Sequence, residues 1–298
     1  MSEHSATSLV DLLAGDAPSV SFEFFPPKDD EGETVLWDTI TELEALDPAF
    51  VSITYGAGGT SQDRTVRVTS RVAAETSLRP VAHLTLVRQT REELAEVLRQ
   101  YADAGVRDVL ALRGDPPGGP RASWEPHPGG LDHAVELVEL ARETGEFTVG
   151  VAAFPEGHPD AGSLDDDAKV LAAKAEAGAA FAITQLFFRA SDYFDLVERV
   201  RSLGADLPIV PGIMPILNFR QVARMAELSG AALPPEVLEV VEPIRDDPAA
   251  VRAAGIDLAT RLCRDLMAGG APGLHFITLN RSKATREIWE RLRAEGVL

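Results

Sequence analysis

The sequence is poor in cysteine and has no long apolar run. Cys263 is the only cysteine among 298 residues, which excludes a disulfide framework and a cysteine-based metal site. No stretch approaches the roughly 18 uncharged apolar residues that a membrane helix needs. Residues 1–18 also lack the basic start and apolar run of a signal peptide. These absences predict a soluble, cytoplasmic protein that does not cross a membrane.

Positive charge is also scarce. The chain has 28 Lys and Arg residues against 47 Asp and Glu residues, a formal net charge of -19. Binding to nucleic acid or to an anionic membrane needs surplus Lys and Arg, so neither partner is expected. A small molecule is the better candidate, and an anionic one would have to be met by cations placed locally.

Several catalytic motifs are missing. The chain has no Gly-x-Ser-x-Gly elbow, no kinase signature and no phosphate loop, which argues against hydrolase and kinase functions. The histidines lack the close pairing of a zinc site, and no acidic cluster has calcium-loop spacing, so no metal site is expected. The acidic run at residues 165–167 is typical of the first turn of a helix.

Short apolar runs alternate with helical patterns along the chain. Helical patterns cover residues 92–101, 131–142, 168–177 and 191–203. A strand-then-helix order implies parallel strands with right-handed crossovers, and eight such units close naturally into a barrel. The runs that predict strands are residues 20–25, 50–55, 80–86, 108–113, 148–154, 181–188, 207–213 and 274–279.

The predicted fold is therefore α/β, a (β/α)8 TIM barrel with extra helices before the last strand. The expected domains are an N-terminal segment at residues 1–18 and a single barrel at residues 19–298, with the extra helices around residues 234–268. A doubly wound sheet is the alternative. It is disfavoured because no Gly-x-Gly-x-x-Gly turn follows the first strand.

Polar residues collect where the predicted strands end. In a barrel of this class the active site lies at the carboxyl ends of the strands, so this bias predicts a binding site at the mouth. Each residue alone also has a purely structural interpretation, such as an interior hydrogen bond. The residues concerned are Glu23, Thr54, Tyr55, His83, Thr85, Arg113, Asp115, Glu156, His158, Gln185, Asn280 and Arg281.

Glu23 is the most informative of these residues. It lies in an aromatic strand that Pro26 and Pro27 stop, and side chains alternate along a strand, so Glu23 points away from Phe22 and Phe24. Apolar surroundings disfavour a charged carboxyl group and predict a raised pKa, which suits a general acid. The alternative is a glutamate that is simply hydrogen-bonded at a strand end.

A set of motifs in order resembles methylenetetrahydrofolate reductase of the bacterial type, from about Ser21 to Arg281. The resemblance implies FAD as cofactor, NADH or NADPH as donor, and ping-pong reduction of 5,10-methylenetetrahydrofolate to 5-methyltetrahydrofolate, which supplies methyl groups for methionine synthesis. It also implies a homo-oligomer. The motifs are SFEFFPP, FVSITYGAGG, VAHLTL, ALRGD, VAAFPEGHP, FAITQLFF, VPGIMPI and HFITLNR.

The resemblance also assigns roles to residues. Glu23 matches the general acid, and Asp115 matches an aspartate between flavin and folate whose charge favours a cationic folate intermediate. Gln185, Gln221 and Arg281 match substrate contacts, along with Glu23 and Asp115, and Thr54 matches a nicotinamide contact. The cofactor-binding positions are Thr54, Tyr55, Ala57, His83, Arg113, Gly114, Asp115, His133, Ala134, Phe154, His158, Asp167 and Lys174.

Some positions depart from the family's pattern. Phe154 and His133 stand where tyrosine is often found, Val170 and Ala173 replace polar residues that help to hold the cofactor, and Met225 replaces an aromatic residue. Ile277 differs from a tyrosine in some members. Weaker flavin retention is therefore expected. Two rival hypotheses are a folate-binding barrel without chemistry and a related barrel flavoenzyme that oxidises an amino acid such as proline.

Overall fold

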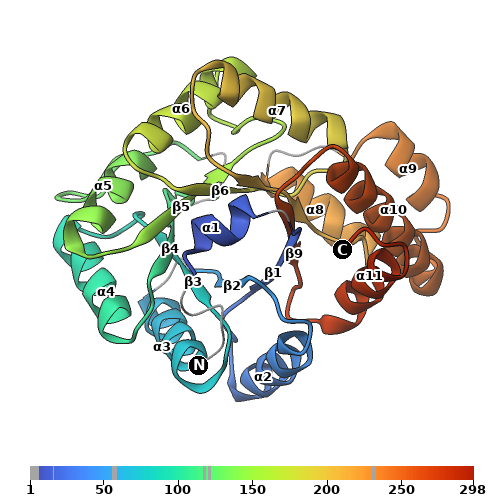
Figure 1. Cartoon of the computed structure of the whole chain (residues 1–298), viewed down its shortest axis with the longest axis horizontal. Coiled ribbons are helices and arrows are strands. Elements are labelled where there is room, and N and C mark those ends of the chain that lie inside the picture. Colours follow the sequence, from blue (N-terminus) through green and yellow to red (C-terminus); the bar gives the residue numbers. More distant parts are fainter. Residues whose placement is uncertain (1–6, 16, 56–58, 117–118, 120–121, 230–232) are drawn as a thin grey trace.

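The fold is a parallel barrel surrounded by helices. A computed structural model describes residues 7–15, 17–55, 59–116, 119, 122–229 and 233–298. Figure 1 shows the strands forming an inner ring and most of the helices forming an outer one. The predicted α/β barrel with extra helices before the last strand is confirmed.

Within the described residues, the strands form one sheet in which every pair of neighbours is parallel. The sheet order is β7-β6-β5-β4-β3-β2-β1-β9-β8. Each of the eight predicted positions holds a strand or, at residues 207–213, two short strands, and most end earlier than predicted. The strands are β1 Ser19–Phe24, β2 Phe50–Ile53, β3 Pro80–Thr85, β4 Asp108–Leu112, β5 Thr148–Ala153, β6 Phe181–Thr184, β7 Ile209–Val210, β8 Gly212–Ile213 and β9 Gly273–Ile277.

The prediction of one continuous seventh strand at residues 207–213 is wrong. Pro211 divides it into β7, which pairs with β6, and β8, which pairs with β9. Proline has no backbone N–H to give to a ladder, while its carbonyl oxygen still accepts a hydrogen bond from the His275 N–H at 2.9 Å. The barrel therefore closes through two short strands.

The helices follow the strands as expected, with two shifted starts. The helix predicted at residues 168–177 begins at Leu164, after the capping residue Ser163. The helix predicted at residues 131–142 begins at Ala134 instead. The Glu136 carboxylate accepts hydrogen bonds from the Asp132 and His133 N–H groups, and these bonds fix the amino end of the helix at Ala134. Among the described helices, none is long and apolar enough to span a bilayer. The helices are α1 Leu9–Ala14, α2 Asp30–Glu44, α3 Gly59–Glu75, α4 Arg91–Asp103, α5 Ala134–Thr144, α6 Leu164–Glu176, α7 Ala190–Ser202, α8 Phe219–Ser229, α9 Pro235–Val241, α10 Pro248–Ala268 and α11 Ser282–Ala294.

Apolar side chains fill the end of the barrel interior that α1 covers, and α1 packs against them. Leu9 and Leu13 of α1 are buried, and Figure 1 shows this helix in the middle of the ring. The barrel interior at the carboxyl ends of the strands is polar, and this is the end of a barrel at which chemistry takes place. The apolar side chains that share one cluster with α1 are Ala49, Phe50, Val81, Leu110, Phe181, Ile183 and Val210.

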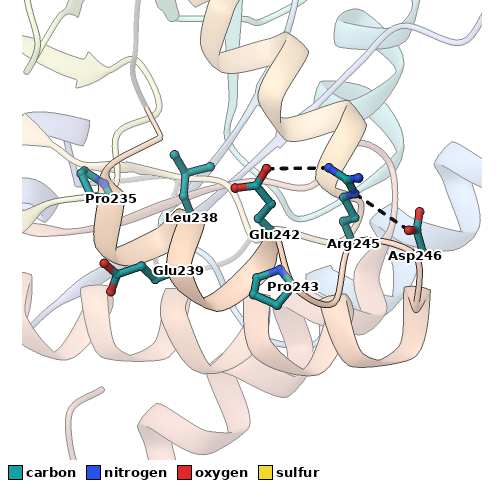
Figure 2. A pocket seen from close by; sticks show the side chains of 7 residues that line it. All are labelled: Pro235, Leu238, Glu239, Glu242, Pro243, Arg245 and Asp246. Atoms are coloured by element: carbon teal, nitrogen blue, oxygen red, sulfur yellow. Dashed lines mark ion pairs between the residues drawn. The ribbon is translucent and has the colours of Figure 1, made fainter.

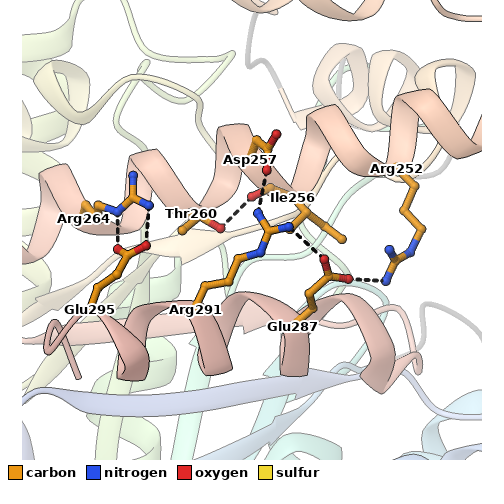
Figure 3. Close-up of polar contacts among 8 residues, drawn as sticks. All are labelled: Arg252, Ile256, Asp257, Thr260, Arg264, Glu287, Arg291 and Glu295. Atoms are coloured by element: carbon orange, nitrogen blue, oxygen red, sulfur yellow. Dashed lines mark hydrogen bonds and ion pairs between the residues drawn. The ribbon is translucent and has the colours of Figure 1, made fainter.

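Helices α10 and α11 lie side by side and are joined by ion pairs (Figure 3). Arg291 bonds to Glu287 at 2.9 Å and to Asp257 at 2.5 Å, and Glu287 also pairs with Arg252 at 2.8 Å. These side chains are all at least one-third exposed, and solvent-exposed pairs contribute little to stability. The buried side of α10 matters more for the fold.

Gly255 on the buried side of α10 is expected to tolerate no side chain. A Cβ atom at this position would lie 1.8 Å from the Ile216 carbonyl oxygen. We expect Gly255→Ala to lower the free energy of unfolding by about 3 kcal/mol through overpacking. Helix propensity alone would instead favour alanine by about 1 kcal/mol. Chemical denaturation measures the difference, with Ala253→Gly as the exposed control, and a variant as stable as the wild type would contradict the packing.

Asp108 is expected to make stability depend on pH. It is buried at the amino end of β4, 3.9 Å from Arg79 Nε, and burial raises its pKa to about 6 despite the opposing charge of Arg79. Because this folded-state pKa lies above the unfolded value, the folded state loses about 3 kcal/mol as the pH rises from about 4 through 6. Asp108→Asn removes that loss.

The stability difference between Asp108→Asn and the wild type should therefore change in favour of the variant as the pH rises from 4 to 7. Urea denaturation at several pH values measures it, and exposed Asp103 provides a matched control as Asp103→Asn. A difference that stays constant with pH would rule out a raised pKa at Asp108.

Candidate active site

Glu23 lies inside the barrel near its mouth. Strand β1 places Phe22 and Phe24 in the layer between strands and helices, so Glu23 and Ser21 face the interior. The side chain of Glu23 is 14% exposed. The orientation inferred from the strand pattern is confirmed.

Two imidazoles approach the Glu23 carboxylate. The Nε2 atoms of His83, on β3, and of His275, on β9, lie 3.7 Å and 3.6 Å from Glu23 Oε2. The His275 ring is fully buried, and its Nδ1 lies 2.8 Å from Ser21 Oγ, while its Nε2 lies 3.3 Å from Ser52 Oγ. These contacts form a buried polar chain beneath the mouth.

Packing fixes the His275 ring in place. The ring stacks on Phe50 with centroids 5.4 Å apart and an angle of 14° between the planes. The hydroxyl groups of Ser21 and Ser52 hold its two nitrogens, one on each side. A ring held in this way keeps Nε2 directed at Glu23.

The expected rise in the pKa of Glu23 is wrong. Burial acts to raise it, but the interaction with His275 and the charges that His83 and His275 can carry outweigh burial and hold the pKa of Glu23 below its ordinary value. Burial also lowers the pKa of His83 to about 4, so this ring is neutral at neutral pH. His275 is then the main partner that keeps Glu23 ionised.

A second group of polar side chains gathers above β4 and β5. Arg113 Nη2 lies 2.8 Å from Asp160 Oδ2, and the guanidinium stacks on Trp124 at 4.8 Å from the ring centroid. The ring of His158 contacts Phe154 edge to face at 4.8 Å. Burial and the charge of Arg113 lower the pKa of His158.

Lys174 and two carboxyl groups complete this second group. Lys174 on α6 donates to the Ala152 carbonyl oxygen at 3.2 Å, and loss of surrounding water lowers its pKa to about 8. Burial raises the pKa of Asp167 against the effect of Lys174. Partial shielding from water raises the pKa of Asp115 against the effect of Arg113.

The mouth fits a phosphate-bearing cofactor. Arg113 and Lys174 are two cations that could meet a pyrophosphate, which an acidic protein must provide locally. Gly114 has φ +81, and a Cβ there would lie 2.7 Å from Val87, so only glycine allows the close turn between Arg113 and Asp115. The buried Thr85 Oγ1 has no hydrogen-bond partner among the described residues.

The remaining residues that the sequence assigns to the site make fewer contacts with the two groups of side chains described above. Thr54 and buried Tyr55 follow β2, Ala134 and exposed His133 lie at the start of α5, and Ala57 lies outside the described residues. Gln185 follows β6, Gln221 is exposed on α8, and Arg281 is exposed before α11. Within the described residues, no hydrogen bond or ion pair joins these last three side chains to one another.

Comparison with known proteins gives the family. The sequence model of the family described as "Methylenetetrahydrofolate reductase" matches residues 9–293, almost the whole chain. The chain belongs to this family. A 5,10-methylenetetrahydrofolate reductase of Salmonella typhimurium is 38% identical over 275 residues, covering 92% of this chain and 90% of that protein.

Other members of the methylenetetrahydrofolate reductase family extend the comparison. The Arabidopsis thaliana protein named "Methylenetetrahydrofolate reductase (NADH) 1" is 38% identical over 275 residues, 89% of this chain and 46% of that protein. Among solved structures, a Clostridium thermocellum protein described as binding two copies of 5-methyl-5,6,7,8-tetrahydrofolic acid superposes with a TM-score of 0.69. At 13% identity, and with 96% of this chain and 98% of that chain covered, it supports the fold.

Sequence reasoning missed His275, Asp160 and Trp124. His275 stands in a quoted reductase motif, and the signal that could have found it is its position next to Ile277 by strand alternation, on the last strand of a barrel that must close beside β1. Asp160 lies in a loop with no pattern that predicts its contact with Arg113. Trp124 lies in the long loop after β4, where spacing predicts no contact.

A surface pocket elsewhere is unrelated to the mouth of the reductase barrel (Figure 2). Its lining comes from α9 and the turn after it, and its charged side chains pair among themselves, Glu242 with Arg245 at 3.7 Å and Arg245 with Asp246 at 3.9 Å. It contains none of the residues that the sequence assigns to the site. Within the described residues, no group of three or more His, Cys, Asp or Glu side chains is arranged to hold a metal ion.

Proposed function

We propose that this protein reduces 5,10-methylenetetrahydrofolate to 5-methyltetrahydrofolate with NADH or NADPH, through FAD, in one barrel domain. Membership of the methylenetetrahydrofolate reductase family and the folate named for the Clostridium thermocellum structure support the substrate. The observation that carries the mechanism is the Glu23 carboxyl group inside the barrel, 3.6 Å from His275 Nε2.

The chain's own residues would hold FAD along one side of the mouth. Arg113 and Lys174 would bind its pyrophosphate, and Phe154, His158 and Asp167 would surround it. The chemistry that bound FAD would supply is transfer of a hydride from the nicotinamide to the folate carbon. Tyr55, His83, Gly114 and Ala134 would be further contacts of the cofactor.

Glu23 would act as the general acid. Protonation of the leaving folate nitrogen lets its bond to the bridging carbon break, which leaves an iminium ion ready to accept a hydride. Because the ligand-free carboxyl group is ionised at neutral pH, it must receive a proton before ring opening. His275, held by Ser21 and Ser52 with its Nε2 3.6 Å from Glu23 Oε2, would keep the carboxyl group in position.

The two substrates would use the same face in turn. Gln185 would contact both the nicotinamide and the folate, Thr54 the nicotinamide, and Gln221 and Arg281 the folate. Such sharing suits a ping-pong cycle, in which one substrate leaves before the other binds. The donor named for the Arabidopsis thaliana relative makes NADH the first donor to test.

Asp115→Asn is expected to affect the two half-reactions in opposite directions. The Asp115 carboxylate disfavours added negative charge next to it and favours a cationic folate intermediate. We expect flavin reduction by NADH to become about tenfold faster and flavin re-oxidation by folate about tenfold slower. Rapid mixing measures both rates, and equal effects on both would remove this role from Asp115.

A steady-state assay tests the function as a whole. Purified protein supplied with FAD should oxidise NADH or NADPH only when 5,10-methylenetetrahydrofolate is present, and chromatography should show one 5-methyltetrahydrofolate for each nucleotide oxidised. Binding of folate without turnover would favour a folate-binding barrel. Reduction of bound flavin by proline would favour the amino-acid oxidase.

A further inference from the structure

Arg113 is already occupied by a carboxylate of the chain itself. Its Nη2 lies 2.8 Å from Asp160 Oδ2, and the arginine side chain is 19% exposed, while the aspartate is 44% exposed. The same Asp160 oxygen lies 3.8 Å from His158 Nδ1, and the Asp160 N–H donates to that nitrogen at 3.1 Å. The Asp160 carboxylate therefore pairs with Arg113, while the Asp160 backbone N–H binds the His158 ring.

The other side of the Arg113 guanidinium is held by Trp124. Its guanidinium lies over the Trp124 ring at 4.8 Å, and the indole N–H donates to Asp132 Oδ1 at 2.6 Å, next to the start of α5. The ring keeps the guanidinium in place through contacts that do not involve Asp160. A change of anionic partner therefore requires movement of the Asp160 loop and not of the arginine.

We propose that Asp160 is a built-in competitor that occupies the pyrophosphate position on Arg113 and so weakens the binding of the cofactor. The proposal rests on the proposed flavin-dependent function. A carboxylate and a phosphate oxygen make the same charge-assisted contact with a guanidinium, so only one of them can hold this face of Arg113.

The local charge balance points the same way. Two cations, Arg113 and Lys174, face three carboxyl groups, Asp115, Asp160 and Asp167, so an entering dianion meets excess negative charge. Asp160 is the one carboxyl group of the three that forms an ion pair within 3 Å of Arg113. Its neutralisation both frees the arginine and removes a repulsive charge.

The test compares FAD binding by the wild type and Asp160→Asn. We expect the variant to bind FAD about tenfold more tightly, equivalent to about 1.4 kcal/mol. Quenching of flavin fluorescence gives both dissociation constants, and riboflavin, which has no phosphate, should bind the two proteins equally. Asp165→Asn is the matched control, because Asp165 is 76% exposed and pairs with Arg199 at 3.3 Å.

Each outcome is decisive. Tighter FAD binding by Asp160→Asn alone, or measurable binding only in that variant, supports the competitor. If the wild type binds FAD and Asp160→Asn binds it equally or more weakly, or if riboflavin binding shifts as much as FAD binding, the competitor is overturned and the proposed function stands. If neither protein binds FAD, both proposals fall.

Discussion

Glu23→Gln is expected to stop folate reduction while NADH still reduces the flavin. Glutamine keeps the size of the side chain but cannot donate an acid proton to the folate nitrogen, and a general acid contributes about 100- to 10,000-fold to such a step. We expect flavin re-oxidation by 5,10-methylenetetrahydrofolate to slow by about 1,000-fold or more. Rapid mixing of the reduced variant with folate measures this rate.

Glu33→Gln provides the control for the loss of a glutamate charge. Glu33 lies on α2 and pairs with Arg67 at 2.7 Å and Arg71 at 3.2 Å, away from the imidazoles. Both half-reactions should keep wild-type rates in this variant. Near-normal folate reduction in Glu23→Gln would remove the acid role, and an equal loss in both half-reactions would indicate a damaged site.

Lys174→Met is expected to weaken FAD binding by about 100-fold, equivalent to about 2.7 kcal/mol. The lysine is partly enclosed in the ligand-free protein, and its pKa is lowered to about 8. A bound pyrophosphate would raise this pKa, so the wild type should bind FAD most tightly below pH 8 and lose affinity as the pH rises above 8. Methionine fills the space without the charge and should abolish that dependence.

Lys169→Met separates this effect from a simple loss of charge on α6. Lys169 is 63% exposed and pairs with Asp166 at 2.9 Å. FAD titrations of the three proteins between pH 6 and 9.5 give the dissociation constants. Equal affinities for Lys174→Met and Lys169→Met would exclude Lys174 as a phosphate ligand.

Local pattern was enough to predict the barrel but not its closure. Strands rich in β-branched residues, each followed by a helix, imply parallel pairing, and eight of them imply a ring. The division at Pro211 depends on which neighbours each half of the strand finds, β6 on one side and β9 on the other. Those neighbours are far apart in the sequence, so spacing cannot give the register.

The pKa of Glu23 shows the limit of reasoning from one strand. Alternation correctly placed the carboxyl group inside the barrel, and burial does act to raise its pKa. The dominant correction comes from His275, which is 252 positions later in the chain and becomes a neighbour only because β9 pairs with β1. The cations at the mouth could be found in the same local way, but the Asp160 contact with Arg113 depends on two separate loops.

One anaerobic mixing experiment can follow the hydride from NADH, through a flavin at the barrel mouth, to folate. Protein loaded with FAD is reduced with NADH until the flavin absorbance near its visible maximum is lost, and 5,10-methylenetetrahydrofolate is then added. We expect the absorbance to return as one 5-methyltetrahydrofolate forms for each flavin. A flavin that stays reduced in the presence of folate would contradict the mechanism.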